Sequence, residues 1–395
     1  MKRFVYADNA ATTPVSREVI DAMMPIFESS WGNPSSLHEK GREAKEILDD
    51  ARERIAAVFN CNASEIYFTS GGTESDNWAI RGAAWQMRAK KGKNHIITSK
   101  IEHHAVLHAC EALERDGFDV SYVGVDEDGI VSLDELRSLV SEKTALVAIM
   151  YANNEVGTIE PIEEIVEIAH SAGALVFTDA VQAVGNIDID LSTLGVDMLA
   201  LSGHKLHAPK GIGMLYIRRG VVISNLIEGG GQERRKRGGT ENLPYIVGLC
   251  KALEVAKERL PELSRVERMR DRLIDELTKI PYSKLNGHRT KRLAGNANVG
   301  FEFIEGESLL LWLDIAGICA STGSACSTAS LEPSHVLIAM GVPHEKAHGS
   351  LRLSISTETT DEDIDYIIEN VTAIVEKLRN MSPLWEDVVK SGSMA

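Results

Sequence analysis

The sequence lacks long hydrophobic runs, paired cysteines and an excess of positive charge. No uninterrupted apolar run approaches the ~20 residues that cross a bilayer, so we expect no membrane-spanning segment. The opening residues, MKRFVYAD, contain no apolar stretch of the length found in a secretory signal peptide. Both absences favour a cytoplasmic protein.

Cysteine is scarce, and its positions show no pairing. The chain has 5 cysteines, an odd number, and no two of them form a CxxC motif. This argues against a disulfide scaffold and against a structural zinc site. The cysteines are Cys61, Cys110, Cys250, Cys319 and Cys326.

Acidic residues outnumber basic ones by 58 to 42, and the net charge is −16. This balance argues against nucleic acid or an anionic membrane surface as the main partner. One compact basic run occupies residues 234–237. A solvated loop is the plainest interpretation of that run, and an anion or partner contact is the alternative.

Strand-like and helix-like stretches alternate between about residues 45 and 220, which predicts an α/β fold with a mainly parallel sheet flanked by helices. The expected strands are residues 65–69, 95–98, 120–123, 145–150, 175–178, 198–202 and 213–217. The expected helices are residues 74–89, 105–115, 132–140 and 162–170. Ligands of such sheets bind at the carboxyl ends of the strands.

The pattern changes after Gly248, which indicates a second, smaller α+β domain. A long amphipathic helix is expected over residues 248–279, with a break near Pro261. Strands are expected at 297–303 and 351–356, and a last helix at 361–378.

Two polar residues at strand ends are the strongest chemical signal. Asp179 directly follows the apolar stretch 175–178, and Lys205 follows the stretch 198–202, between Ser202 and His207. Alone, Asp179 could cap a helix and Lys205 could lie on the surface. Together, at two strand ends, they match the needs of pyridoxal phosphate, which requires a lysine for covalent attachment and an acid for its ring nitrogen.

A candidate phosphate site precedes them. Ser70, Gly71, Gly72 and Thr73 stand between a predicted strand and a predicted helix. Backbone N–H groups at a helix N-terminus bind anions, and glycine permits close approach. A Gly-Gly turn by itself is weak evidence, but no G-x-G-x-x-G or P-loop pattern competes with it.

The surroundings of Cys326 differ from those of the other cysteines. Small polar residues flank it from 321 to 330, which predicts an exposed, mobile loop and an accessible thiol. Cys319 lies at the end of the apolar stretch 309–320, and we expect it in the core.

Residues 344–348, HEKAH, match the H-E-x-x-H pattern of zinc proteases. That pattern needs a sustained helix and a further ligand downstream. Pro343 precedes it and Gly349 follows it, so we expect a short solvated helix and no resident metal.

Taken together, these motifs resemble the cysteine desulfurases of iron–sulfur cluster assembly, which are fold-type-I pyridoxal-phosphate enzymes of the class V aminotransferase family. The likeness runs nearly end to end. Besides the segments around Asp179, Lys205 and Cys326, it covers residues 7–14, 32–36, 69–77, 102–103, 153–157, 229–232 and 237–242.

The resemblance implies pyridoxal 5'-phosphate as cofactor and a role for each matching residue. Lys205 would carry the cofactor, Asp179 would pair with its ring nitrogen, and His103 would stack on the ring and move protons. Asn154 and Gln182 would bond the ring hydroxyl region. The phosphate would be bound by Gly72, Thr73, Ser202 and His204, and by Thr240 of the neighbouring subunit in a homodimer.

The resemblance also implies the substrate and the reaction. Arg352, with Asn154, would bind L-cysteine through its carboxylate, since a bidentate arginine suits that task. Cys326, Lys205 and His103 would be the catalytic residues, and the sulfur would rest on Cys326 as a persulfide. Its acceptor would be an iron–sulfur cluster scaffold protein, and Cys326 is a candidate transient iron–sulfur ligand during that transfer.

On this resemblance the large domain spans residues 15–255, and the small domain comprises residues 1–14 and 256–395, with the cysteine loop at about 321–332. Three positions depart from the family pattern: Gly72 replaces a common alanine, His207 a common tyrosine and Gly238 a common serine.

Two alternatives stay open. A selenocysteine lyase or another pyridoxal-phosphate relative would use the same parts, although an aminotransferase has no use for a mobile cysteine. A non-catalytic protein that binds a scaffold is the alternative of another class, and the intact Lys205, Asp179, His103 and Cys326 argue against it.

Overall fold

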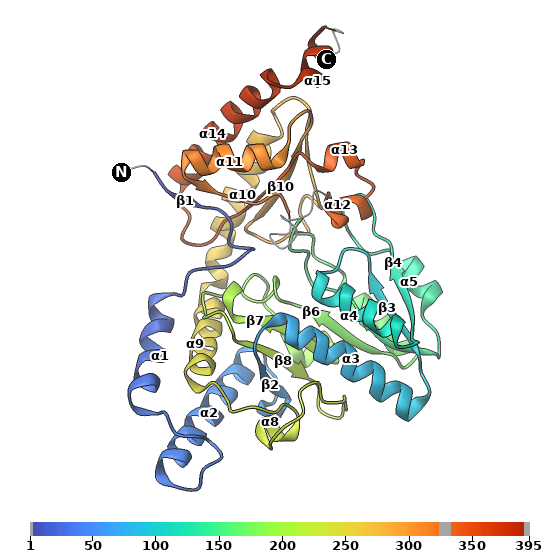
Figure 1. Cartoon of the computed structure of the whole chain (residues 1–395), viewed down its shortest axis with the longest axis vertical. Coiled ribbons are helices and arrows are strands. Elements are labelled where there is room, and N and C mark those ends of the chain that lie inside the picture. Colours follow the sequence, from blue (N-terminus) through green and yellow to red (C-terminus); the bar gives the residue numbers. More distant parts are fainter. Residues whose placement is uncertain (1–2, 324–332, 391–395) are drawn as a thin grey trace.

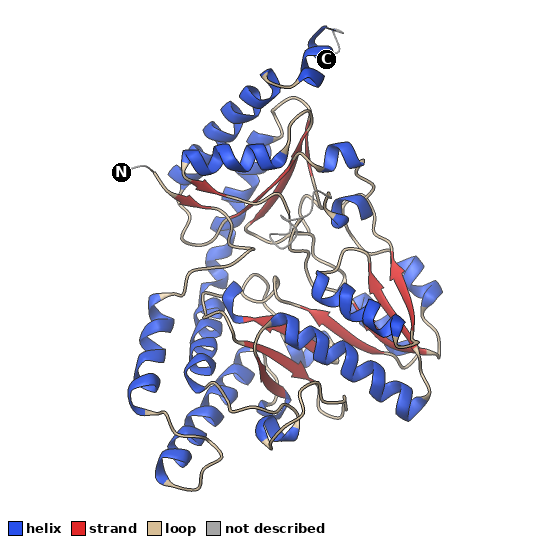
Figure 2. Cartoon of the chain, in the orientation of Figure 1, coloured by secondary structure: helices blue, strands red, loops and turns tan. Residues whose placement is uncertain are grey.

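The computed structural model describes residues 3–323 and 333–390. A larger lobe is built on one seven-stranded sheet, and a smaller lobe holds both ends of the described chain (Figures 1 and 2). The sheet order is β2-β8-β7-β6-β5-β3-β4. In chain order the strands are β2 (Ile66–Thr69), β3 (His95–Ser99), β4 (Asp119–Val123), β5 (Thr144–Ala148), β6 (Leu175–Asp179), β7 (Met198–Ser202) and β8 (Gly213–Ile217).

Six strands of this sheet run in one direction, because β8 is antiparallel to both of its neighbours, β2 and β7. The strands are apolar on both faces. Ile96, Leu146 and Phe177 pack in one buried cluster, whereas Ile97 and Val147 pack in another on the opposite face. This alternation follows the two-residue period of a strand, and both faces are covered as parallel sheets require.

Helices cover both faces of the sheet. On one side lie α3 (Gly72–Lys91) and α4 (His104–Arg115), which share a core cluster. The other helices of the larger lobe are α1 (Arg17–Ser29), α2 (Glu39–Val58), α5 (Leu133–Leu139), α6 (Ile162–Ser171), α7 (Leu191–Leu194), α8 (Gln232–Arg235) and α9 (Leu243–Arg259). A short 3₁₀ turn at Leu260–Glu262 separates α9 from α10 (Leu263–Leu277), as the proline predicted.

The smaller lobe contains a three-stranded antiparallel sheet. Its central strand β10 (Asn296–Phe301) pairs with β9 (Ser283–Leu285) and β12 (Ser350–Ser354). Two short strands, β1 (Val5–Tyr6) and β11 (Ile318–Cys319), pair in parallel beside it. The helices are α10, α11 (Gly306–Ala316), α12 (His335–Ala339), α13 (His344–Ala347), α14 (Asp361–Asn380) and α15 (Pro383–Lys390).

The predicted α/β class is confirmed, and several elements match closely. The strands expected at 198–202 and 213–217 are β7 and β8, and the last long helix expected at 361–378 is α14. The expected helix at 74–89 begins two residues earlier, at Gly72. The HEKAH segment forms only the four-residue helix α13. No cluster within the described residues could hold a metal ion.

One burial prediction was wrong. Cys319 is half-buried, not in the core. It ends the two-residue strand β11, where successive side chains point to opposite sides, so Ile318 occupies the core and Cys319 does not. Among the described residues, no helix is both long enough and apolar enough to cross a bilayer.

The basic run 234–237 makes contacts within its own chain. Arg234 donates to the backbone carbonyls of Ser64 and Ile66, and Arg237 pairs with Glu74 at 2.8 Å. Part of the run is therefore structural, because it ties α8 and the residues just after it to β2 and to the first turn of α3.

Candidate active site

One cavity lies at the carboxyl ends of the parallel strands, where β6 ends at Asp179 and β7 ends at Ser202. It encloses about 830 Å³, part of it open to solvent. Ten residues predicted from the sequence line it together: Gly72, Thr73, His103, Asn154, Asp179, Gln182, Ser202, His204, Lys205 and Arg352. They come from both lobes and span 280 positions of the chain, so the fold alone brings them together.

Lys205 enters the cavity from a 3₁₀ turn, Gly203–Lys205, that directly follows β7. Its Nζ donates to the carbonyl oxygens of Ala10 and Ala11, at 2.7 Å each. Gln182 Nε2 donates to the same Ala10 oxygen at 3.0 Å. The N-terminal segment 8–13 therefore forms one wall and orients the lysine. Sequence reasoning missed this wall, because backbone carbonyls carry no residue-type signal.

Two carboxylates lie in the floor. Asp179 Oδ1 accepts from the Val181 N–H at 2.9 Å, and burial raises the pKa of Asp179 to about 6, while that N–H and Lys205 oppose the rise. Asp76, only 1% exposed, also lines the cavity, and its Oδ1 has no partner among the described residues. Burial and the nearby Asp179 hold the pKa of Asp76 well above its ordinary value.

Asp76 was not predicted, although a signal existed. It lies four positions after Gly72, and residues four apart share one face of a helix. That face of α3 carries the phosphate-binding candidates, so an acid in register with them points into the same site. The other lining residues that were not predicted are Ala10, Ala11, Met150, Ala152 and Val181.

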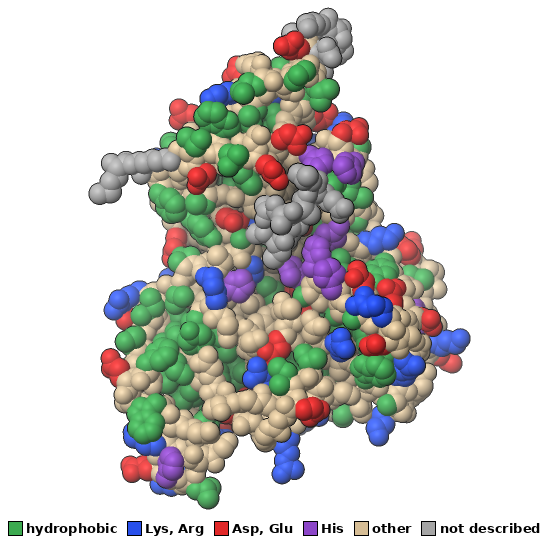
Figure 3. Space-filling view, viewed as in Figure 1, with side chains coloured by type: hydrophobic (Ala, Val, Ile, Leu, Met, Phe, Trp, Pro, Cys, Tyr) green, Lys and Arg blue, Asp and Glu red, His purple; other side chains and the backbone are tan. Residues whose placement is uncertain are grey.

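His103 caps α4. Its Nδ1 accepts from the Ala105 N–H at 3.1 Å, so Nδ1 carries no proton and the neutral ring is protonated at Nε2. Burial lowers the pKa of His103 to about 4, and the positive charge of Lys205 adds to this effect. His104, His108 and His335 stand nearby, and histidine side chains gather on this face of the molecule (Figure 3). His103 is thus a neutral ring at physiological pH.

The candidate phosphate end lies at the N-terminus of α3. Gly71 caps the helix without a side-chain acceptor, so the first N–H groups of the helix have no intrahelical partner. A Cβ on Gly72 would approach Val181 Cγ2 to 2.8 Å, which shows how closely the backbone lies against the cavity wall. Thr73 and Ser202 add hydroxyl groups to this end.

His204 completes this end of the cavity. Its Nδ1 lies 3.1 Å from Thr12 Oγ1, and burial with Lys205 lowers the pKa of His204 to about 4. It therefore offers a neutral imidazole.

Arg352 reaches the cavity from β12 of the smaller lobe. Its Nη2 pairs with Asp8 at 3.0 Å, and its Nη1 donates to the Asn154 carbonyl at 3.0 Å. The side chain is almost fully buried, and its Nε has no partner among the described residues. A buried guanidinium that lines a cavity and keeps an unused donor suits a carboxylate ligand.

Two predicted residues are not part of this cavity wall. Thr240 is exposed and lies outside it. Cys326 lies outside the described residues. The described residues on either side of it both lie close to Glu155: a Cβ on Gly323 would lie 2.9 Å from Glu155 Oε2, and Ser334 Oγ donates to that same oxygen. Glu155 directly follows Asn154 of the cavity wall.

The cavity fits pyridoxal phosphate. It offers a lysine for attachment, a buried acid opposite, and uncapped N–H groups at a helix terminus for the phosphate. The unpartnered Asp76 Oδ1 and Arg352 Nε are buried polar atoms that a polar ligand would satisfy. The residues that would hold the group are Gly72, Thr73, His103, Asn154, Asp179, Gln182, Ser202, His204 and Lys205.

Comparisons with known proteins agree with this geometry. A family model described as aminotransferase class-V matches residues 5–367. A cysteine desulfurase IscS of Methanosarcina thermophila is 58% identical over 381 residues, which cover 96% of this chain and 94% of that protein. A cysteine desulfurase IscS of Dictyoglomus turgidum is 51% identical and covers 97% of each chain.

Solved structures resemble the chain over almost its whole length. A NifS-like protein superposes with a TM-score of 0.89 and 41% identity, and covers 95% of this chain and 100% of that one. A structure described as SspA in complex with cysteine gives a TM-score of 0.79 at 36% identity and covers 90% of this chain and 100% of that one.

Proposed function

The chain belongs to the class-V aminotransferase family as a cysteine desulfurase that depends on pyridoxal phosphate, and we propose that the residues of the cavity carry out its reaction. The observation that carries this proposal is the meeting, in one cavity at the strand ends, of ten residues predicted from the sequence motifs and the family resemblance. Lys205 is the attachment lysine, and Asp179 is the acid that pairs with the ring nitrogen. When bound, the cofactor supplies an electron-withdrawing ring that acidifies the α-proton of the substrate.

Arg352 binds and orients the substrate. Its guanidinium is fixed by Asp8 and the Asn154 carbonyl, so little conformational entropy is lost when it binds the carboxylate of L-cysteine. Asn154 adds a polar contact beside it. Lys205 lines the same cavity, so a substrate bound at Arg352 would lie in the space that the lysine enters.

Two side chains handle protons. Lys205 Nζ is held by the carbonyl groups of Ala10 and Ala11, and it would move the α-proton of the substrate. His103 stays neutral, with its proton on Nε2, and it would stack on the cofactor ring and move protons.

Cys326 is the sulfur acceptor. Its thiolate attacks the sulfur of the substrate, so that an S–S bond forms as the C–S bond breaks and the electron pair stays on the carbon fragment. That fragment takes up a proton and leaves as L-alanine, while the persulfide remains on Cys326. Cys326 is three residues from Gly323, which lies beside Glu155, and Glu155 directly follows Asn154 of the cavity wall.

A homodimer would complete the site. Thr240 is exposed on its own chain, where it is available to the phosphate of a neighbouring subunit. Helix α1 also exposes an apolar row, with Ile20, Met24 and Phe27 exposed by 37%, 46% and 52%. Such a row at helical spacing is typical of a subunit contact.

We propose an iron–sulfur cluster scaffold protein as the sulfur acceptor in the cytoplasm.

The proposed domain division follows the cores. One large cluster gathers residues of α1, α2 and α9, and a separate cluster gathers Val5, Ala7 and residues from Val266 onward. This supports a large domain of residues 15–255 and a small domain of residues 1–14 and 256–395.

Product analysis tests the reaction. The cofactor-loaded protein, given L-cysteine and a thiol reductant, is expected to release sulfide and alanine in equal amounts. Pyruvate with sulfide would indicate a lyase, and turnover of selenocysteine alone would favour the selenocysteine alternative.

The Cys326→Ala variant tests the nucleophile. It is expected to keep the yellow cofactor but to lose sulfur transfer, whereas Cys319→Ala, which changes a half-buried cysteine outside the cavity wall, serves as the matched control. Sulfide release at the normal rate by Cys326→Ala would refute the assignment.

A further inference from the structure

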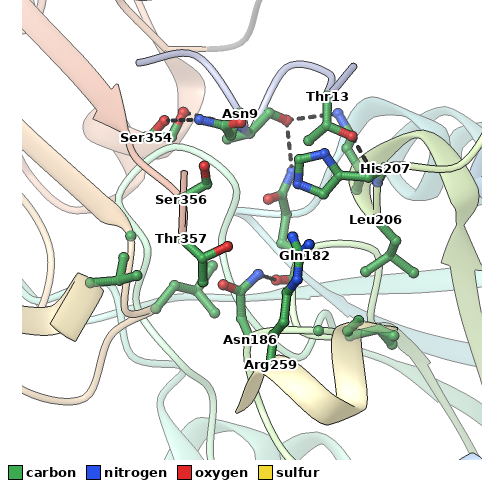
Figure 4. Close-up of a pocket in the computed structure, with 18 of the residues that line it drawn as sticks. Asn9, Thr13, Gln182, Asn186, Leu206, His207, Arg259, Ser354, Ser356 and Thr357 are labelled. Atoms are coloured by element: carbon green, nitrogen blue, oxygen red, sulfur yellow. Dashed lines mark hydrogen bonds between the residues drawn. The ribbon is translucent and has the colours of Figure 1, made fainter. Parts of the chain in front are cut away.

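A second cavity lies behind the active site, on the other side of the N-terminal segment 8–13. It encloses about 960 Å³, part of it open to solvent, and it is lined by both lobes. Figure 4 shows Ser356 and Thr357 on one side of it, facing Gln182, Asn186 and Arg259 on the other. Among the residues with proposed roles, Lys205 and Gln182 also line this cavity, whereas Asp179, His103 and Arg352 do not.

The cavity has an apolar interior with a polar rim. Its apolar wall is built mainly by the end of α9, the start of α10 and the residues beside β6 and β12. Val184, Leu206, Ala252, Leu263, Val266 and Ile355 are representative members. The rim carries hydroxyl and amide groups, among them Ser356 and Asn186. Such a mixture suits a small molecule with an apolar body and one polar end.

The charge of the lining indicates the sign of that polar end. No aspartate or glutamate lines the cavity, although acids outnumber bases by 58 to 42 in the chain. The ionisable residues that do line it are Lys205, His207 and Arg259. Arg259 Nη2 lies 3.1 Å from Glu18 Oε1, and this pair is partly exposed, with side chains 30% and 45% accessible. A ligand anion could replace such a screened surface partner at small cost.

We propose that this second cavity binds a small organic anion with an apolar tail, of the class of a medium-chain monocarboxylate, with its head at Arg259 and its tail between α9 and the residues that follow β12. The site is adjacent to the catalytic lysine. Ala10, Gln182 and Lys205 line both cavities, and the Ala10 carbonyl accepts from the other two. An occupant would therefore contact the wall that orients Lys205.

Calorimetric titration of the cofactor-loaded protein with octanoate tests the proposal, and it does not depend on the proposed reaction. Octanoate is expected to saturate one site per chain, while octanol, which lacks the charge, and acetate, which lacks the tail, bind at least tenfold more weakly. Arg259→Gln is expected to weaken octanoate binding about tenfold, as the loss of one charge-assisted hydrogen bond implies.

Matched variants separate this effect from a general loss of charge. Lys257 lies two positions away on α9, does not line the cavity and pairs with Asp188 much as Arg259 pairs with Glu18, so Lys257→Gln should leave the affinity unchanged. Glu18→Gln removes the competing carboxylate and should tighten binding. The absence of saturable binding, equal effects of Arg259→Gln and Lys257→Gln, or weaker binding in Glu18→Gln would each overturn the proposal.

Discussion

His103 has two separable roles, and replacing it by asparagine or by alanine separates them. The imidazole caps α4 through the Ala105 N–H, and it is a mostly buried ring beside Lys205. Asparagine is among the best N-cap residues, so His103→Asn keeps the cap and removes only the imidazole. His103→Ala removes both, and it should cost about 1 kcal/mol more in the free energy of unfolding.

The magnitude of the pH effect follows from the pKa. Burial lowers the pKa of His103 to about 4 in the folded chain, against an ordinary value near 6.5 in the unfolded chain. Between these two values the unfolded chain binds the extra proton, so stability rises with pH and is complete above about 6.5. The difference is worth about 3 kcal/mol, and His103→Asn should abolish this contribution.

Denaturant unfolding of the cofactor-free proteins at pH 4.5 and pH 7.5 measures this pH-dependent contribution of His103 to stability. The free energy of unfolding of His103→Asn, taken relative to that of wild type, should rise by about 2–3 kcal/mol when the pH is lowered from 7.5 to 4.5. Loss of the catalytic imidazole should lower sulfide release by about 10²-fold or more in both variants. An equal stability difference at the two pH values would refute the assigned pKa and the buried, neutral state of the ring.

Three further predictions concern single side chains. Glu233→Gln should lower the free energy of unfolding, measured in urea, by about 3 kcal/mol. The reason is that buried Glu233 accepts hydrogen bonds from Arg52 at 2.8 Å and from the Phe68 N–H. An unchanged urea midpoint would contradict this prediction. Arg352→Lys should raise the KM for cysteine at least tenfold with a smaller effect on kcat, since lysine lacks the planar fork, and an unchanged KM would exclude Arg352 as the carboxylate ligand. Asp179→Asn keeps an acceptor for the Val181 N–H but should lower kcat by about 10²-fold, and activity near that of wild type would mean that another acid serves the cofactor.

Local patterns were sufficient to predict the elements around the site. The strands β7 and β8 are short apolar runs bounded by polar or glycine residues, and all their residues are buried. Because a charged residue at or shortly after the end of such a run lies at the edge of the sheet, Asp179 and Lys205 could be placed at the strand ends from the sequence alone.

The missing parts of the prediction have a common physical cause. The carbonyl groups of Ala10 and Ala11 hold Lys205 from almost 200 positions away, and the half-buried Cys319 depends on the pairing of β11 with β1. Neither contact produces a periodic pattern of residue types in the sequence, because the first uses backbone atoms and the second uses a strand of only two residues. Asp76 was missed for a different reason: its spacing from Gly72 places it on the face of α3 toward the site, but its burial is evident only in the structure.

The N-terminal segment 8–13 links the two lobes through the site itself. On the side of the smaller lobe, Asp8 pairs with Arg352, and Asn9 and Ala10 bond to Ser354 of the same strand, β12. On the side of the larger lobe, the Ala10 and Ala11 carbonyls hold Lys205. A displacement of β12 relative to the large sheet must therefore change the position of the substrate arginine and of the lysine together. The second cavity also lies against this segment. The six residues 8–13 therefore connect three features: the substrate arginine Arg352, the lysine Lys205 and any anion bound at Arg259.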